Sequence, residues 1–205
     1  PKGMAAPVTY NNMESTPYAA NRNTVSGGQL HQTVSGGRTG TVNTLRSYNF
    51  TYGYVEARIK VPSCSGCWPA FWMLGSTPAP AAQAWPPEID IFEFFPNIPG
   101  GHPLFNSHWR NSSGAVVSLD SISPNGQRGP TTDMANYTGA FHTYGFAWTR
   151  DYVQGYIDGV PGQRYSGPMV PHQAMYLILT LQSAKGYTTP DGSAMHTDYV
   201  RVYKQ

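Results

Sequence analysis

Alternation of apolar and polar positions runs through most of the chain and predicts a succession of β-strands. In YGYVEARIKV, residues 52–61, apolar side chains occupy every second position from Val55 on, and charged side chains occupy the positions between them. A strand with this pattern has one face toward a core and one polar face. Similar alternation recurs at 144–148, 152–157, 175–181 and 199–203, and no segment shows sustained helical periodicity.

Turn signals separate these predicted strands. The pair Asp158-Gly159 closes the strand before it, and TVSGG occurs at 24–28 and 33–37, where each glycine pair favours a hairpin over a true repeat. The Gly/Pro-rich segments 74–87 and 96–103 are expected to form loops at the ends of an apolar, acidic strand. Many short strands with regular turns predict an all-β sandwich of two antiparallel sheets.

Composition supports one domain over residues 1–205, because this length buries one core and suits a large sandwich. Only 12% of the residues are charged, the net charge is +2, and no Lys/Arg cluster stands out, so neither nucleic acid nor an anionic membrane is expected as a partner. No apolar run is long enough to span a membrane. The opening PKGMAAPVTY lacks the apolar region of a signal peptide, which agrees with a processed or trimmed chain.

The only two cysteines, Cys64 and Cys67, form a CSGC sequence. A thioredoxin-like redox site would place the first cysteine at the start of a helix, whereas CWPAFWML follows here, so a short disulfide that ties a loop is favoured. Three glycosylation sequons, at Asn49, Asn111 and Asn136, fit the secreted location that we expect for the protein.

The sequence WPPEIDIFEFFP, residues 85–96, places three carboxylates in an apolar run. On a helix, Glu88, Asp90 and Glu93 would share no face. On a regular strand, Glu88 and Asp90 share a face but Glu93 points into the core, where its burial would be costly. One extra residue bulging at Ile91-Phe92 returns Glu93 to the face of the other two acids, so we predict a bulge there.

Carboxylates grouped in this way suit glycosidic bond cleavage. Four residues of strand rise separate the Cα atoms of Glu88 and Glu93 by about 13 Å, and inward-leaning side chains bring the carboxyls to the ~5 Å of a retaining glycosidase. The wider spacing of an inverting enzyme is also sterically open. Close like charges raise at least one pKa, which keeps one acid protonated while the other is ionised.

Here the residues resemble a known family. EIDIFE matches the E-x-D-x-x-E signature of glycoside hydrolase family 16. The chain is similar to the laminarinase-like branch of that family, in the right order from about residue 25 to residue 203, through EIDIFE and five further segments: YGYVEARIKVP, WPAFWMLG, FHTYGFAWTRD, YIDG and DYVRVY. Six ordered segments are not a chance pattern.

The resemblance implies a β-jelly-roll sandwich, concanavalin A-like, with a concave substrate cleft. It also implies that Glu88 is the nucleophile of a retaining mechanism, Glu93 the acid/base and Asp90 a residue that hydrogen-bonds and tunes the nucleophile. No cofactor would be required for catalysis. The expected partner is a β-glucan polysaccharide or oligosaccharide, and the protein is expected to act as a monomer.

Further residues are assigned to substrate binding by resemblance or position. Trp68, Trp72 and Trp85 are candidates for the cleft, with the sandwich core as the alternative for each, and Trp148 is a weaker candidate. His108 corresponds to a histidine beside the acid/base residue, with an ordinary strand histidine as the alternative. Two other candidates are Arg46, aligned with a sugar-contacting arginine, and Gln182 for a subsite.

The chain departs from the family at its opening segment, where the acidic pair has no counterpart in residues 1–13. Many members build a structural calcium site partly from that segment on the convex face. Asp198 aligns with a usual calcium ligand, but one carboxylate does not make a calcium site. The Gly-rich sequence expected after the penultimate strand is also altered.

The sequence therefore predicts a secreted, retaining endo-β-glucanase acting on β-1,3- or mixed β-1,3/1,4-glucan. Rivals within the family act on another polysaccharide, such as a galactan, or transfer the glycosyl unit to a sugar. A rival from another class is a non-catalytic carbohydrate-binding jelly roll, against which the three acids argue.

Overall fold

The computed structural model of the chain describes residues 14–64, 66–78, 82–94, 104–119 and 137–204. The predicted loop 96–103 and the sequon at Asn136 lie outside the described residues. No helix in the described part has the length and apolar character needed to cross a bilayer.

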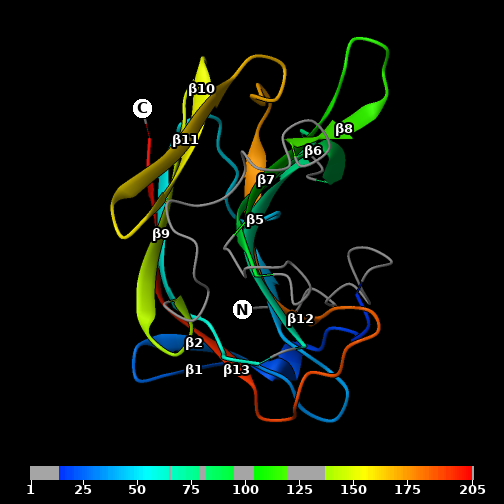
Figure 1. The fold of residues 1–205 in the computed structure, drawn as a ribbon, viewed down its shortest axis with the longest axis vertical. Helices are drawn as coiled ribbons and strands as arrows, with labels where there is room; N and C mark the ends of the chain where they lie inside the picture. Colours follow the sequence, from blue (N-terminus) through cyan, green and yellow to red (C-terminus); the bar gives the residue numbers. More distant parts are fainter. Residues whose placement is uncertain (1–13, 65, 79–81, 95–103, 120–136, 205) are drawn as a thin grey trace.

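Two antiparallel β-sheets pack face to face, as the sequence predicts (Figure 1). The seven-stranded sheet has the order β1, β2, β13, β4, β9, β10, β11, and the six-stranded sheet the order β3, β12, β5, β6, β7, β8. The elements are a single 3₁₀ turn, η1 (Ala20–Arg22), followed by β1 (Asn23–Ser26), β2 (Gln29–Thr33), β3 (Thr41–Asn43), β4 (Gly53–Lys60), β5 (Cys67–Ser76), β6 (Gln83–Glu93), β7 (Leu104–Arg110), β8 (Val116–Ser118), β9 (Phe141–Trp148), β10 (Tyr152–Ile157), β11 (Val160–Ser166), β12 (Met175–Ser183) and β13 (Ala194–Tyr203).

The predicted strands and turns are confirmed where the sequence alternates. Burial in β4 alternates along its whole length, with Val55, Ala57 and Ile59 on the core side. The first TVSGG forms the β1–β2 hairpin, whose turn glycines Gly27 and Gly28 both have positive φ. Because glycine has no Cβ, it adopts such a turn without strain.

The expectation of a loop over residues 74–87 is wrong. Strand β5 continues to Ser76, and β6 already begins at Gln83, with which Ser76 pairs. The register then skips from Gly75–Ala84 to Leu74–Glu88, so segment 85–87 bulges out of the ladder with β5. Two prolines in this bulge lack an N–H group, so leaving the ladder costs them no donated hydrogen bond.

The main hydrophobic core fills the space between the two sheets. It takes the inward side chains of both sheets, and Phe71, Met73, Ile89, Phe146 and Leu181 are among its members. A second, smaller apolar cluster lies on the opposite face of the six-stranded sheet and consists of Ala70, Trp72, Leu74, Tyr176 and Ile178. The central strands of this sheet are therefore apolar on both faces, and the acids of β6 emerge beside the smaller cluster.

Ile89 anchors the acidic strand to the core, since it is fully buried between Met73 and Ser107 of the neighbouring strands. Ile89→Ala should lower the free energy of unfolding by about 2–5 kcal/mol, because the substitution leaves a cavity. Val25→Ala serves as control, since Val25 is 75% exposed, and should change stability by no more than about 0.5 kcal/mol. Urea denaturation measures both values, and equal values would contradict this packing.

Candidate active site

A break in the alternation of β6 brings the three acids to one face. Phe92 pairs with Phe71 of β5 and Asp90 pairs with Trp72, so Ile91 is the extra residue between them. Ile91 and Phe92 are consecutive, yet both lie in the core between the sheets. The predicted bulge is confirmed. It places Glu93 on the same face as Glu88 and Asp90, since the parity of the strand changes at the bulge.

Glu88 lies among side chains that can bind its carboxylate. The indole Nε1 of Trp85 donates a hydrogen bond to Glu88 Oε2 at 2.5 Å. His108 on β7 is the cross-strand partner of Glu88, and its Nε2 lies 3.7 Å from Asp90 Oδ2. Ligand atoms of Glu88, Asp90 and His108 all lie within 4.8 Å of one another. His108 was expected beside Glu93, but the register places it beside the other two acids.

Burial dominates the electrostatics of Glu88. Loss of water around the carboxyl raises the pKa of Glu88 above its ordinary value, because the charged form is the one that burial penalises. His108, the Trp85 N–H and a hydrogen bond with Asp90 act in the opposite direction and favour the ionised form. The net effect is that Glu88 keeps its proton to a higher pH than an exposed glutamate does.

Glu93 has a different partner at the other end of the acidic face. Trp68 Nε1 donates a hydrogen bond to Glu93 Oε1 at 2.9 Å. An indole N–H can only donate, so this oxygen accepts, and a proton on Glu93 would sit on the other oxygen. Each glutamate is therefore oriented by an indole, with Trp85 on Glu88 and Trp68 on Glu93.

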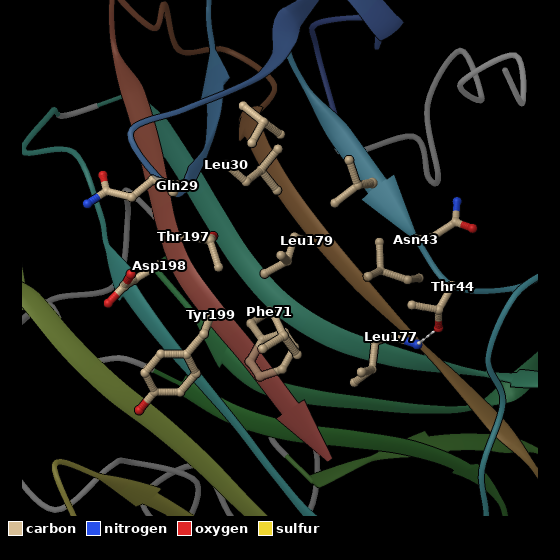
Figure 2. A pocket seen from close by; sticks show the side chains of 15 residues that line it. Gln29, Leu30, Asn43, Thr44, Phe71, Leu177, Leu179, Thr197, Asp198 and Tyr199 are labelled. Atoms are coloured by element: carbon tan, nitrogen blue, oxygen red, sulfur yellow. Dashed lines mark hydrogen bonds between the residues drawn. The ribbon is translucent and has the colours of Figure 1, made fainter. Parts of the chain in front are cut away.

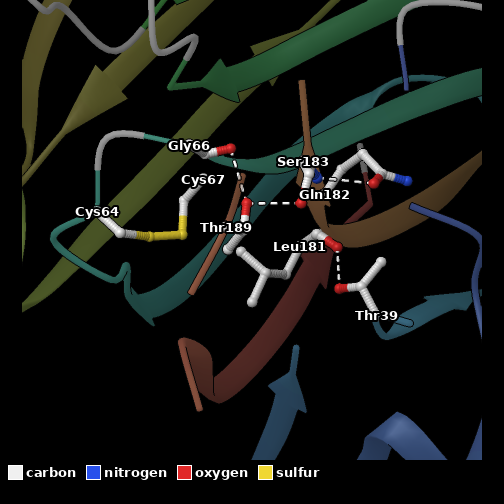
Figure 3. The surroundings of a disulfide bond; sticks show 8 residues. All are labelled: Thr39, Cys64, Gly66, Cys67, Leu181, Gln182, Ser183 and Thr189. Carbon is white, nitrogen blue, oxygen red and sulfur yellow. Dashed lines mark hydrogen bonds between the residues drawn. A yellow bond between two sulfur atoms is a disulfide. The ribbon is translucent and has the colours of Figure 1, made fainter. Parts of the chain in front are cut away.

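Hydrogen bonds tie the disulfide loop to the end of β12 through Thr189 (Figure 3). The predicted disulfide joins Cys64 and Cys67, and Cys67 begins β5 next to Trp68. The Thr189 hydroxyl donates to the Gly66 carbonyl at 2.8 Å and accepts a hydrogen bond from Ser183 at 2.6 Å. The loop after β12 is thereby held against the start of β5.

Gln182 lies opposite Trp68 in the β5–β12 ladder and is 1% exposed. Its amide nitrogen donates to the Thr16 carbonyl at 2.8 Å, and its oxygen accepts hydrogen bonds from the Thr16 and Ser183 N–H groups. The amide therefore ties residue 16 to the sheet. Its role in substrate binding stays a prediction.

The remaining sequence candidates lie at different depths. Trp72 belongs to the cluster on the acidic face and donates to the Thr180 hydroxyl at 3.2 Å, whereas Trp148 is in the main core. Trp85 is 49% exposed and its ring centroid lies 6.3 Å from that of His108. Arg46 is exposed in the turn after β3, next to Leu45, which packs on the smaller cluster.

Sequence reasoning missed Asn106 and Thr180. Asn106 is the cross-strand partner of Asp90, is 7% exposed and donates to His108 Nε2 at 3.3 Å. Asn106 and His108 are two residues apart in NSHWRN, so on a strand their side chains point to the same face. This spacing is the signal that could have placed both on the acidic face.

Asp198 does not lie in a calcium-binding arrangement. The guanidinium of Arg58 contacts its carboxylate at 2.7 Å and also lies 4.5 Å from the ring centroid of Phe141. Within the described residues, Asp198 belongs to no group of three acidic or histidine ligands. Calcium is coordinated by several oxygen ligands, so a carboxylate already paired with an arginine does not fit the ion.

The geometry supports acid–base chemistry with two carboxylates. Glu88 and Glu93 stand on one face of β6, separated by the Ile91 bulge, and each keeps one oxygen on an indole N–H. Glu88 has His108 and Asp90 as further neighbours that favour its ionised form, and different neighbours can give two carboxyls different protonation states. A proton donor and an ionised nucleophile can therefore coexist on this face.

Comparisons with known proteins point to the same chemistry. A family model described as glycosyl hydrolases family 16 matches residues 9–201. The endo-1,3-1,4-beta-glycanase ExsH of Rhizobium meliloti is 32% identical over 170 residues, which cover 80% of this chain and 33% of that protein. The glucan endo-1,3-beta-glucosidase A1 of Niallia circulans is 31% identical over 191 residues, which cover 82% and 26%. The chain thus spans a third or less of these relatives.

The fold is shared with solved structures. LamAcat from Zobellia galactanivorans matches with a TM-score of 0.75 at 24% identity, over 96% of this chain and 86% of that chain. The predicted jelly-roll sandwich is confirmed by this likeness and by the two antiparallel sheets.

The raised pKa of Glu88 makes stability depend on pH. Between the unfolded and the higher folded pKa the native state binds more protons, so stability falls as pH rises through this window. Glu88→Gln removes the buried charge and should raise the melting temperature at pH 7, by about 2–4 °C for each kcal/mol relieved. Below the unfolded pKa of about 4.3 the difference should vanish. Calorimetry at both pH values tests this, and a destabilised Glu88→Gln at pH 7 would refute it.

Proposed function

This chain belongs to the glycosyl hydrolases of family 16, and on that premise we propose that it is a retaining endo-β-glucanase. Its substrate would be β-1,3- or mixed β-1,3/1,4-glucan, in line with the activities for which its relatives are named. The observation that carries the proposal is the bulge at Ile91, which groups Glu88, Asp90 and Glu93 on one sheet face. A sheet that only bound sugar would not need three carboxylates grouped at a cost in desolvation.

Catalysis would proceed by double displacement. Glu88 attacks the anomeric carbon, the glycosidic bond breaks, and its electron pair leaves with the departing oxygen, which takes the proton of Glu93. In the second step Glu93 removes a proton from water, and the water oxygen attacks the anomeric carbon and releases Glu88 as a carboxylate. The two carboxyls perform these steps without a cofactor.

The neighbours of Glu88 would set its reactivity. The Trp85 N–H and His108 favour the ionised carboxylate that attacks, whereas burial limits its solvation. Asp90, 1% exposed beside them, shares a hydrogen bond with Glu88.

The aromatic side chains would bind the sugar rings. Trp85 is half exposed next to Glu88, so its face is available for stacking on a pyranose ring. Trp68 and Trp72 are largely buried on the acidic face and would contact sugar only by an edge. His108 and Asn106 would add polar contacts on the β7 side.

We further propose that the protein works outside the cytoplasm, where its polymeric substrate is found. The Cys64–Cys67 disulfide supports this location, because such bonds persist mainly in oxidising compartments.

Reducing-sugar release from laminarin, lichenan, agarose and xyloglucan tests the substrate. Release from agarose alone would favour the galactan rival, new oligosaccharide linkages would favour transfer, and binding without release would favour a non-catalytic module.

Glu88→Ala should abolish hydrolysis of laminarin while leaving its binding largely intact, because the nucleophile is lost but the aromatic side chains remain. Glu93→Ala should reduce hydrolysis of natural glucan by about 10²–10⁴-fold. The same variant should keep its first step on a glycosyl fluoride, whose leaving group needs no proton. Stopped assays of both substrates check this pair of variants.

The matched comparison separates the two roles. Substantial laminarin hydrolysis by Glu88→Ala would remove Glu88 as nucleophile, and equal losses on fluoride and glucan in Glu93→Ala would remove Glu93 as acid. NMR of the first-formed product should show the retained anomer, and the inverted anomer would exclude double displacement.

The acid limb of the pH profile should depend on Trp85. Glu88 must be ionised in the free enzyme, so kcat/KM falls as pH drops through its pKa. Trp85→Phe removes the N–H donor that lowers the pKa of Glu88, so the acid limb should move to higher pH. Trp72→Phe is the control, because its N–H donates to Thr180 instead, and its acid limb should stay in place. An unmoved limb in Trp85→Phe contradicts the prediction.

A further inference from the structure

Two histidines meet on the outer face of the seven-stranded sheet, on the sheet opposite the acids. His31 of β2 and His196 of β13 are direct cross-strand partners. Their Nδ1 atoms lie 2.6 Å apart, and the rings are edge to face with centroids separated by 4.9 Å. Both side chains are partly buried, and neither has a role in the proposed mechanism.

Ser26 determines how His31 presents its nitrogens. His31 Nε2 lies 3.1 Å from the Ser26 carbonyl oxygen and 2.9 Å from its hydroxyl. A carbonyl can only accept, so Nε2 carries the proton and the Nδ1 of a neutral ring keeps its lone pair. This lone pair faces His196 Nδ1. A backbone carbonyl that fixes one ring nitrogen in this way is typical of metal-binding histidines.

His196 supports the same arrangement. Burial lowers the pKa of His196, and the neighbouring His31 and Lys60 lower it further. In the pair as it stands, His196 Nδ1 donates its proton to His31 Nδ1. If that proton moves to solvent and Nε2 is protonated instead, the ring stays neutral and two Nδ1 lone pairs converge.

We propose that the Nδ1 atoms of His31 and His196 bind a first-row transition-metal dication such as zinc, with water completing the coordination. Two imidazole nitrogens on one zinc ion stand about 3.4 Å apart at the tetrahedral angle, with bonds of about 2.0–2.1 Å. The pair would have to open by roughly 0.8 Å, which small rotations of two partly buried rings can provide. Imidazole ligands suit zinc, copper and nickel and would select against calcium.

The ion would join β2 to β13 at the place where the β1–β2 hairpin meets its sheet. The β1–β2 hairpin joins its sheet only through β13. Behind the hairpin, a cavity of about 320 Å³ separates it from the other sheet. Figure 2 shows Leu30 of β2 lining this space together with Phe71 and Leu179 from the six-stranded sheet. A metal bridge on the outer face would hold β2 to β13 on the side of the sheet opposite this cavity.

Zinc titration of the tag-free full chain tests the proposal, with heat of binding and the ring ¹⁵N signals of His31 and His196 as readouts. Wild type should bind zinc with shifts at both rings, and zinc should raise its melting temperature. His31→Gln and His196→Gln should each weaken binding at this site by about tenfold or more and should lose the thermal shift.

Two further variants serve as controls. His172→Gln removes an exposed histidine whose Nδ1 shares a hydrogen bond with the Tyr52 hydroxyl, and this variant should bind zinc as wild type does. His108→Gln disrupts the competing group of Glu88, Asp90 and His108, and the shifts at His31 and His196 should persist in it. The proposal is overturned if the two rings do not respond at millimolar zinc, or if zinc binding and the thermal shift disappear only in His108→Gln.

Discussion

The arrangement of this protein depends on one constraint, which is that a carboxylate cannot enter the core of a β-sandwich unpaired. Strand β6 carries Ile89, Ile91 and Phe92 into that core and still has to present three acids. A regular strand could not do both, because Glu93 would face Phe71 and its neighbours. The additional residue at Ile91 resolves the conflict and sets the face on which chemistry can occur.

The strands on both sides complete this face. From β5, Trp68 donates to Glu93, and from the bulged start of β6 itself, Trp85 donates to Glu88. From β7 comes His108, opposite Glu88. The result is two carboxyls in unlike surroundings. Burial raises the pKa of Glu88, whereas His108 and the nearby hydrogen-bond donors lower it. Unlike surroundings are what a double displacement requires of its nucleophile and its acid.

The two sheets differ in what they do with their outer faces. The six-stranded sheet has a second apolar cluster and the acids there, and its loops are held by the Cys64–Cys67 disulfide and by Gln182. The outer face of the seven-stranded sheet instead carries the Arg58–Asp198 ion pair and the histidine pair at the β2–β13 junction. The acidic face and the junction of β2 with β13 therefore lie on opposite sides of the core.

Sequence alone determined the strands, the turns, the acidic triplet and the need for a bulge, because alternation and the cost of burying charge are local properties of the chain. Register and strand order were decided only by the tertiary structure. In the structure, His108 lies beside Glu88 and not beside Glu93, and β5 and β6 extend into the expected loop. The Gln182 amide is hydrogen-bonded to Thr16. Register and strand order also brought together His31 and His196, 165 residues apart. Such contacts arise between strands that are distant in sequence, and no local pattern specifies which strands become neighbours.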